Sequence, residues 1–269
     1  MKRFIAIALS VLAGVFAVWF YCKSRVNSAG KTEKIALCVG TSGDYPPMEY
    51  YQDGVLTGFE VELVRLIGEK LGREIAFKDM EFTVAKDALA MKLIDVLAAT
   101  ITKSEEGVER FDFGIPYCRS KALLVSKKGR PITSAKDLFD KKVAYQIGPT
   151  WKKIMEKNLP EEAIIPMDRA DICMEMLKSG QVDCVLIDEI VASIYCKNNS
   201  EYATYFLEDV FVLPEGVTNF GDEICIIFTK GSPLKAEFNG ALKGLESSGE
   251  LRALKKKWGL SVEWKLPNE

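Results

Sequence analysis

The residues best suited to binding a ligand lie in five short loops, at 41–47, 79–83, 99–104, 146–151 and 188–190. Each loop follows a run of residues that we predict to be a strand. In open α/β sheets, ligands bind beyond the carboxyl ends of the strands. We therefore expect the five loops to face one cleft, which would be the binding site.

The chain contains no histidine, which is the commonest general base and zinc ligand. This absence argues against hydrolases and zinc enzymes. The cysteines form no CxxC or CxxxC pair, which argues against a metal cluster; they are Cys22, Cys38, Cys118, Cys173, Cys184, Cys196 and Cys225. Their odd number leaves at least one thiol unpaired within the chain. We interpret them as small buried side chains and leave one disulfide open, between Cys184 and Cys196. We predict no metal and no cofactor.

The composition is that of a globular protein with one or two domains of ordinary size. The chain has 269 residues, of which 48% are hydrophobic and 28% are charged, with a formal net charge of −2. Acidic and basic residues are interspersed along the chain without a long basic stripe. We therefore predict that the protein does not bind nucleic acid.

The first thirty residues predict an export signal or a membrane anchor. Met1–Arg3 carries two positive charges, and Phe4–Tyr21 is uncharged and mostly apolar. The length of the apolar run fits both cleavage, for example after Ser28, and retention as an anchor. Lipidation at Cys22 is disfavoured by the bulky residues that precede it. Because the positive start favours the inner side of the membrane, the rest of the chain is expected outside.

The body of the chain alternates between strand and helix patterns in two similar halves. The first half has strands at 34–40, 74–78 and 95–99 and helices at 59–71, which Gly72 would end, and at 84–92. The second half has strands at 142–146, 164–167 and 182–187 and helices at 151–157 and 170–179. This alternation predicts mostly parallel sheets.

Two further apolar runs, at 122–126 and 224–229, are expected to be strands that cross between the halves. The tail at 233–258 reads as amphipathic helix and is expected to pack on the first half. We thus predict an α/β protein of two doubly wound lobes joined by a two-strand hinge. Lobe 1 would comprise 34–118 and 222–269, and lobe 2 would comprise 119–221, after an export segment at 1–30.

A series of short motifs then points to a family. In order they are Gly40-Thr41 with Tyr45-Pro46-Pro47-Met48-Glu49, Gly58-Phe59-Glu60-Val61-Glu62, Asp95-Val96, Phe111-Asp112-Phe113 with Pro116-Tyr117, Lys142-Val143-Ala144, Gly180-Gln181-Val182-Asp183, and Asp188. Their order and spacing resemble those of the periplasmic polar amino-acid-binding proteins of ABC transporters, the bacterial solute-binding protein family 3. The resemblance covers about 34 to 260 and implies a fold that resembles the periplasmic binding proteins.

The resemblance also implies a binding site for a zwitterion. Asp188 would accept the ligand's ammonium group, although it can instead be read as the cap of the following helix. Tyr45 and Phe82 match two aromatic walls that enclose the ligand side chain, the alternative being ordinary core aromatics. Thr100 and Thr102 match donors on one loop.

Further features of the resemblance concern the carboxylate and the side chain of the ligand. Thr150 matches a donor at a helix N-terminus, where carboxylates bind well. Ser42 stands where lysine- and arginine-binding relatives tend to have an acid, with Asp44, Glu49 and Glu81 nearby in the sequence.

Two positions depart from the family pattern. Gly107 occupies the place of an arginine that holds the ligand carboxylate, and Arg110, one helical turn later, is the candidate replacement. Pro149 has no N–H to offer where relatives have a donor. Both departures weaken carboxylate binding, so a ligand without an α-carboxylate also stays open.

The function that the resemblance implies is capture of a small polar ligand, expected to be an amino acid, in the periplasm and its delivery to an ABC permease. Rotation about crossovers near 118–124 and 216–224 would close the lobes of a monomeric protein over the ligand. The alternatives are a dehydratase acting on cyclic prephenate-like acids and a membrane-anchored ligand sensor. The protein is expected not to be an enzyme, because no histidine and no clamping arginine is available for the dehydratase reaction.

Overall fold

The computed structural model describes residues 36–129, 131–197, 199–215, 217, 223–263 and 266. Ala36–Glu269 forms one compact unit. The predicted export segment, with Cys22, lies outside the described residues. None of the helices in the described ranges combines the length and the apolar character that crossing a membrane requires.

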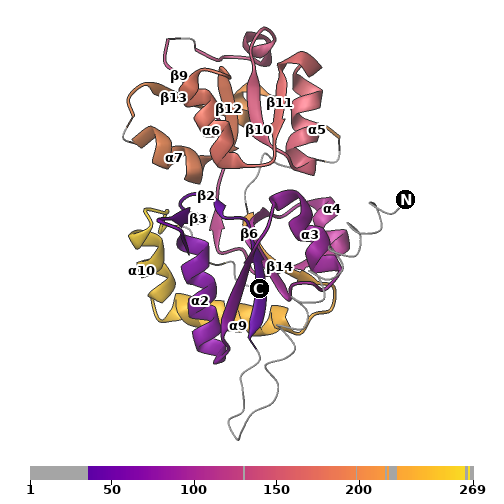
Figure 1. Cartoon of the computed structure of the whole chain (residues 1–269), viewed down its shortest axis with the longest axis vertical. Coiled ribbons are helices and arrows are strands. Elements are labelled where there is room, and N and C mark those ends of the chain that lie inside the picture. The colour runs from indigo at the N-terminus through magenta and orange to yellow at the C-terminus, as the bar shows by residue number, and fades with distance from the viewer. Residues whose placement is uncertain are drawn as a thin grey trace, which may run out of the picture. The chain divides into compact units, whose positions relative to one another are not determined.

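Six of the described strands form the first sheet, which is part of the lower lobe in Figure 1. Their order is β5-β1-β6-β14-β7, with β8 also on β14. β1 pairs in parallel with β5 and β6, whereas β14 is antiparallel to its neighbours. The strands are β1 (Leu37–Thr41), β5 (Ile75–Asp79), β6 (Val96–Thr102), β7 (Phe111–Phe113), β8 (Cys118–Arg119) and β14 (Glu223–Thr229).

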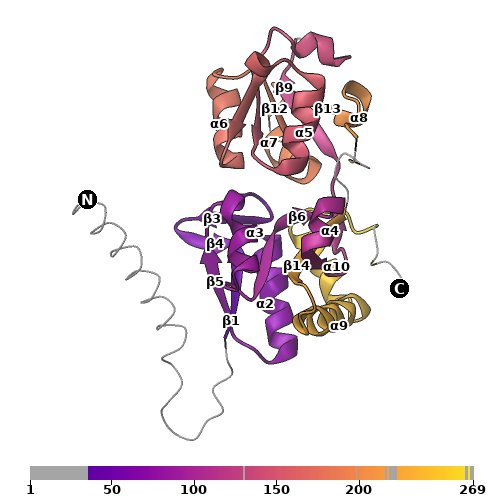
Figure 2. The ribbon, with the colours of Figure 1, turned by 90° about the vertical axis from the view of Figure 1, so that its right-hand side faces the viewer.

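Helices cover this sheet, and α2 begins and ends where the sequence indicates. α3 lies two residues earlier than expected, and the tail forms two helices, α9 and α10. α2 turns its apolar stripe to the sheet and stops at Gly72, whose φ of 64° suits a residue without a side chain. α9 and α10 pack against α2, as expected for the tail (Figures 1 and 2). The helices of this lobe are α2 (Phe59–Leu71), α3 (Phe82–Ala90), α4 (Glu105–Arg110), α9 (Leu234–Ser247) and α10 (Glu250–Lys257).

Five described strands form the second sheet, in the order β11-β10-β12-β9-β13. β10 pairs in parallel with β11 and β12, and β9 is antiparallel to β12 and β13. The strands are β9 (Ala122–Lys127), β10 (Val143–Gln146), β11 (Ile164–Met167), β12 (Cys184–Asp188) and β13 (Tyr202–Phe206). Their helices are α5 (Pro149–Asn158), α6 (Ala170–Ser179), α7 (Glu189–Lys197) and α8 (Leu207–Val210), with short 3-10 turns at Ala135–Leu138 and Glu161–Ala163.

A small hairpin sheet was not expected from the sequence. It contains β2 (Asp44–Tyr45), β3 (Glu49–Gln52) and β4 (Val55–Thr57) in sequential antiparallel order. It begins within the loop expected at 41–47 and extends beyond it to Thr57. The hairpin therefore holds the residues from Asp44 to Glu49 in fixed positions at the carboxyl end of the first sheet.

The two expected crossing strands do not themselves cross. β9 pairs only within the second sheet and β14 only within the first, among the described residues. The chain instead leaves the first sheet after Arg119 and enters the second at Ala122, and it returns in the segment before Glu223. That return segment lies largely outside the described residues, so the proposed lobe boundaries stay a prediction.

The disulfide left open between Cys184 and Cys196 is not formed. Neither residue is in a disulfide, and the same holds for the four other cysteines that the structure describes. Cys184 is a buried residue of β12 in the second sheet, and Cys196 packs on a different group of core residues. The cysteines are therefore mostly small core side chains, as interpreted.

Candidate functional site

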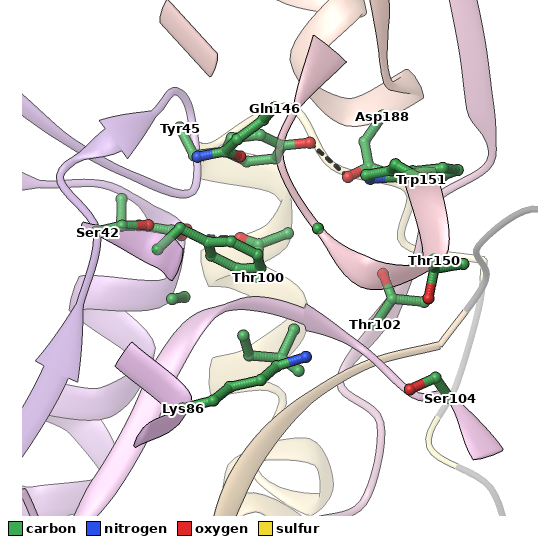
Figure 3. A pocket seen from close by; sticks show the side chains of 15 residues that line it. Ser42, Tyr45, Lys86, Thr100, Thr102, Ser104, Gln146, Thr150, Trp151 and Asp188 are labelled. Atoms are coloured by element: carbon green, nitrogen blue, oxygen red, sulfur yellow. Dashed lines mark hydrogen bonds between the residues drawn. The ribbon is translucent and has the colours of Figure 1, made fainter. Parts of the chain in front are cut away.

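One pocket in the described part of the chain is lined by residues from both lobes (Figure 3). The first lobe contributes the ends of β1 and β6, the hairpin and α3, and the second contributes the ends of β10 and β12 and the start of α5. These are the carboxyl ends of the strands, where the sequence analysis expected the cleft. The lining residues are Ser42, Tyr45, Glu49, Phe82, Lys86, Ala99, Thr100, Ile101, Thr102, Ser104, Gln146, Gly148, Thr150, Trp151 and Asp188.

Seven of the eight residues predicted for the site line this pocket: Ser42, Tyr45, Phe82, Thr100, Thr102, Thr150 and Asp188. Arg110 is the exception, and its assignment to the site is corrected. Its guanidinium Nη2 lies 3.0 Å from Asp87 Oδ1, and its side chain is 51% exposed. The guanidinium also stacks over the ring of Phe111, 5.2 Å from the centroid. The short helix α4 thus directs Arg110 to the outer surface and not to the cleft.

Asp188 is the last residue of β12, in the second lobe, and its side chain is hydrogen-bonded to Tyr45 of the first lobe. Tyr45 donates its hydroxyl hydrogen to Asp188 Oδ2 over 2.5 Å, and both side chains are buried. Burial raises the pKa of Asp188 to about 6 from a usual value of 3.8, although the Tyr45 hydrogen bond opposes this. Asp188 Oδ1 is buried without a hydrogen-bond partner in the described residues. This oxygen can therefore accept a hydrogen bond from a cationic group in the pocket.

A second acidic cluster, of Glu49 and Glu60, lies around Thr100, where the strand pairing of β6 is irregular. The pairing of β6 with β14 shifts register between Leu97 and Ile101, and Thr100 takes a φ of 47°, which β-branched residues rarely adopt. Its amide donates to Glu60 Oε2 over 2.8 Å, and its hydroxyl donates to Glu49 Oε2 over 2.8 Å. Tyr117 donates to the other oxygen of Glu60.

The two glutamates of this cluster share a low-dielectric site. Burial raises the pKa of Glu49 well above its usual value, and the nearby charge of Glu60 raises it further. Burial also raises the pKa of Glu60, against the opposing hydrogen bonds that it accepts. Glu49 Oε1 is buried and, within the described ranges, has no hydrogen-bond partner. The pocket thus contains two separate carboxyl groups, of Asp188 and Glu49, that each have one oxygen without a hydrogen-bond partner in the described residues.

Asp44 makes a further connection between the lobes. It lies on the hairpin of the first lobe, and its Oδ2 accepts from the Gln146 side chain and from the Ala170 amide, both over 3.0 Å. The Ala170 amide begins α6, where a carboxylate is favourable. Burial raises the pKa of Asp44 to about 6. Asp44 therefore holds the second lobe against the first and is not available as a pocket acid.

Sequence reasoning missed several residues that line the pocket, among them Lys86, Ser104, Gln146 and Trp151. Lys86 could have been found, because a residue four positions after Phe82 shares its face of a helix. Glu49 was noted only as part of a motif. Glu81, which was considered as a pocket acid, is exposed and does not line the pocket.

The comparisons with known proteins agree with this geometry. The model of the family "Bacterial extracellular solute-binding proteins, family 3" matches residues 37–261. The chain is 35% identical to the arginine-binding extracellular protein ArtP of Bacillus subtilis, over 86% of this chain and 89% of that protein. It is 29% identical to the L-cystine-binding protein TcyJ of Escherichia coli, over 93% of this chain and 92% of that protein.

Solved structures of the same class share the fold. The arginine-, lysine-, histidine-binding protein ArtJ from Geobacillus stearothermophilus superposes with a TM-score of 0.73 at 28% identity, covering 87% of this chain and 97% of that chain. The predicted architecture of two α/β lobes resembling the periplasmic binding proteins is thereby confirmed, as is the amino-acid-binding function. The chain belongs to the bacterial extracellular solute-binding proteins of family 3 and is an amino-acid-binding component of ABC transport.

Proposed function

We propose that this protein binds an amino acid with a cationic side chain, with L-arginine as the first candidate. The observation that supports this is the pair of buried carboxylate oxygens in the pocket, Asp188 Oδ1 and Glu49 Oε1, for which the described residues supply no donor. Two separate acceptors require a ligand with two separate donor groups. An α-ammonium group would meet Asp188, and a guanidinium or a second ammonium group would meet Glu49.

The aromatic lining of the pocket favours a planar cation. Tyr45, Phe82 and Trp151 line it, and a guanidinium group stacks well on aromatic faces. Ser42, where an acid was expected for a basic ligand, lines the same pocket as Glu49. We propose that Glu49 takes the role of that acid. The relatives named for arginine, ArtP and ArtJ, point to the same ligand class.

A calorimetric screen tests this proposal. Residues 36–269 are titrated with L-arginine, L-lysine, L-histidine, L-glutamine and L-cystine, and arginine is expected to bind most tightly. Tightest binding of cystine or glutamine would contradict the cationic side chain and leave the family function intact. Such a result would also remove Glu49 as the acceptor of a ligand charge.

Glu49→Gln is expected to weaken arginine binding by about 10- to 100-fold, because it removes a charge-assisted hydrogen bond of about 1.5–3 kcal/mol. Glutamine binding is expected to change much less, since its amide carries no charge. Glu81→Gln is the matched control, because Glu81 is exposed outside the pocket lining. An arginine affinity that stays equal in Glu49→Gln and wild type would contradict the assignment.

Arginine binding is expected to depend on pH. Asp188 must be ionised to accept an ammonium group, and its pKa in the ligand-free protein is raised to about 6. Below about pH 6 the protonated form of Asp188 predominates, so the affinity for arginine falls by up to about tenfold per pH unit. Binding then releases the proton of Asp188 to the solvent. The raised pKa of Glu49 acts in the same direction. Titrations between about pH 5 and 7.5, in buffers of different ionisation enthalpy, measure both effects; a constant affinity with no proton release would contradict them.

The setting of this activity is part of the proposal. The family is extracellular, and we propose that residues 1–30 export the chain and that the protein works on the outer side of the inner membrane, either released or tethered. It would act as a monomer that closes over its ligand, deliver it to an ABC permease and catalyse no reaction. Small-angle scattering with and without arginine tests closure, since an unchanged radius of gyration at saturation would rule it out.

A further inference from the structure

The acidic residues of the pocket cannot bind the α-carboxylate of an amino acid. Asp188 and Glu49 are suited to cationic groups, and an ionised carboxylate placed beside either would be repelled. The hydroxyl groups of Thr102, Ser104 and Thr150 also line the pocket and can donate hydrogen bonds. They carry no charge, so a carboxylate in this partly enclosed space needs a cation as well.

Position 107 offers no room for such a cation. A Cβ atom on Gly107 would lie 2.9 Å from Cζ of Phe113 and 2.9 Å from the Ser104 hydroxyl oxygen. That hydroxyl accepts from the Gly107 amide and so begins α4. A side chain at position 107 would therefore displace either the core ring or the cap of the helix. Arg110 lies on the outer surface, bound to Asp87.

Lys86 is the one basic residue among the described residues that line the pocket. It is half-buried on α3, one helical turn after Phe82, and its Nζ lies 6.0 Å from the centroid of the Phe82 ring. Figure 3 shows the side chain extended across the pocket, with its nitrogen on the side where Thr102 and Ser104 lie. Its long flexible stem allows the ammonium group to follow a ligand.

We infer that Lys86 binds the ligand's α-carboxylate through its ammonium group, with the nearby threonine and serine hydroxyls as additional donors. The inference rests on the proposed function only in that the ligand carries an α-carboxylate. It gives the pocket two charged ends, with Lys86 at the carboxylate and Asp188 at the α-ammonium. A zwitterion is then bound in one orientation, and Glu49 is left for the side chain.

The test compares each amino acid with its α-amide, which keeps the ammonium group and the side chain but loses the carboxylate charge. L-Arginine and L-argininamide are titrated calorimetrically into the wild type, Lys86→Met, Lys86→Arg and Lys92→Met. Lys92 is exposed outside the pocket lining, so Lys92→Met controls for the loss of one positive charge. Lys86→Met is expected to bind arginine about 10- to 100-fold more weakly than the wild type and to bind argininamide as the wild type does. Lys86→Arg keeps the positive charge and is expected to retain most of the arginine affinity.

Equal losses for arginine and argininamide would overturn the inference, because the lysine would then act on the pocket as a whole. Unchanged arginine binding in Lys86→Met would overturn it as well. Retained argininamide binding also shows that the variant is folded. If the wild type prefers another amino acid, the proposed cationic ligand fails, and the same comparison is made with that amino acid and its α-amide. The two proposals therefore fail separately.

Discussion

Asp188→Asn is expected to bind arginine at least about 100-fold more weakly than the wild type while unfolding at a higher denaturant concentration. The loss of binding follows because a buried ammonium group would lose its charged acceptor, which typically costs about 3–5 kcal/mol. The gain in stability follows because the asparagine oxygen can still accept from Tyr45, whereas the cost of burying a charge is gone. The binding loss is measured by calorimetry.

The stability change of Asp188→Asn has a defined pH dependence. A buried carboxyl group with a pKa of about 6 instead of 3.8 costs the folded state about 3 kcal/mol once it is ionised, because one pKa unit equals about 1.4 kcal/mol. Since the folded pKa is raised, this cost is absent below about pH 4 and complete above about pH 6. Urea unfolding should therefore show little difference between variant and wild type near pH 4 and a clear gain for the variant near pH 7.5.

Glu189→Gln is the matched control for Asp188→Asn. Glu189 is the next residue in the chain and is exposed, so its neutralisation changes the local charge without changing a buried group. Neither binding nor stability is expected to change by more than a few tenths of a kcal/mol in this control. Equal stability of Asp188→Asn and wild type near pH 7.5, with a normal control, would show that Asp188 is not a costly buried charge.

Glu60→Ala is expected to lower the free energy of unfolding by about 3 kcal/mol. It leaves the Thr100 amide and the buried Tyr117 hydroxyl without their acceptor, and each unpaired buried group costs about 1–3 kcal/mol. It also removes the main restraint on the left-handed backbone of Thr100 that the structure describes. Urea unfolding near pH 7.5 measures the change.

Two companion variants separate the parts of this effect. Tyr117→Phe removes one hydrogen bond but retains the ring beside Phe59, so about 1 kcal/mol of destabilisation is expected. Glu62→Ala, on the same helix, tests the loss of a partly exposed ion pair with Lys257, which is worth less than about 1 kcal/mol. A Glu60→Ala variant as stable as Glu62→Ala would contradict a structural role for the cluster.

Elements with a strong local signal were predictable from the sequence. α2 and α6 have the expected bounds, since their apolar residues keep a helical period and Gly72 and Gly180 end the two helices with positive φ. β11 also has the expected bounds, because three of its four residues are apolar. The hairpin β2–β4 escaped prediction because its strands are short and β2 and β3 lack the apolar run that indicates β11. α3 begins two residues earlier than expected, which places Phe82 in its first turn.

Predicting the site from the sequence was harder, because its key contacts join distant residues. Tyr45 and Asp188 are 143 positions apart in the chain, and no local pattern reveals their hydrogen bond. The bulge in β6 that turns Thr100 toward Glu49 and Glu60 depends on pairing with β14. Arg110 was misplaced because helical spacing indicates which residues are neighbours but not which face of a six-residue helix meets the cleft.

The hydrogen bonds of Asp44 have a consequence for the protein without ligand. They join the hairpin to Gln146 and Ala170, so they exist only when the lobes are together, whether or not an amino acid is bound. Their free energy therefore favours closure of the empty protein and raises the fraction of molecules that are closed at rest. A permease that recognises closed lobes would then meet unloaded protein as a competitor. Effective transport requires these bonds to be weak enough that loading with ligand decides which molecules reach the permease.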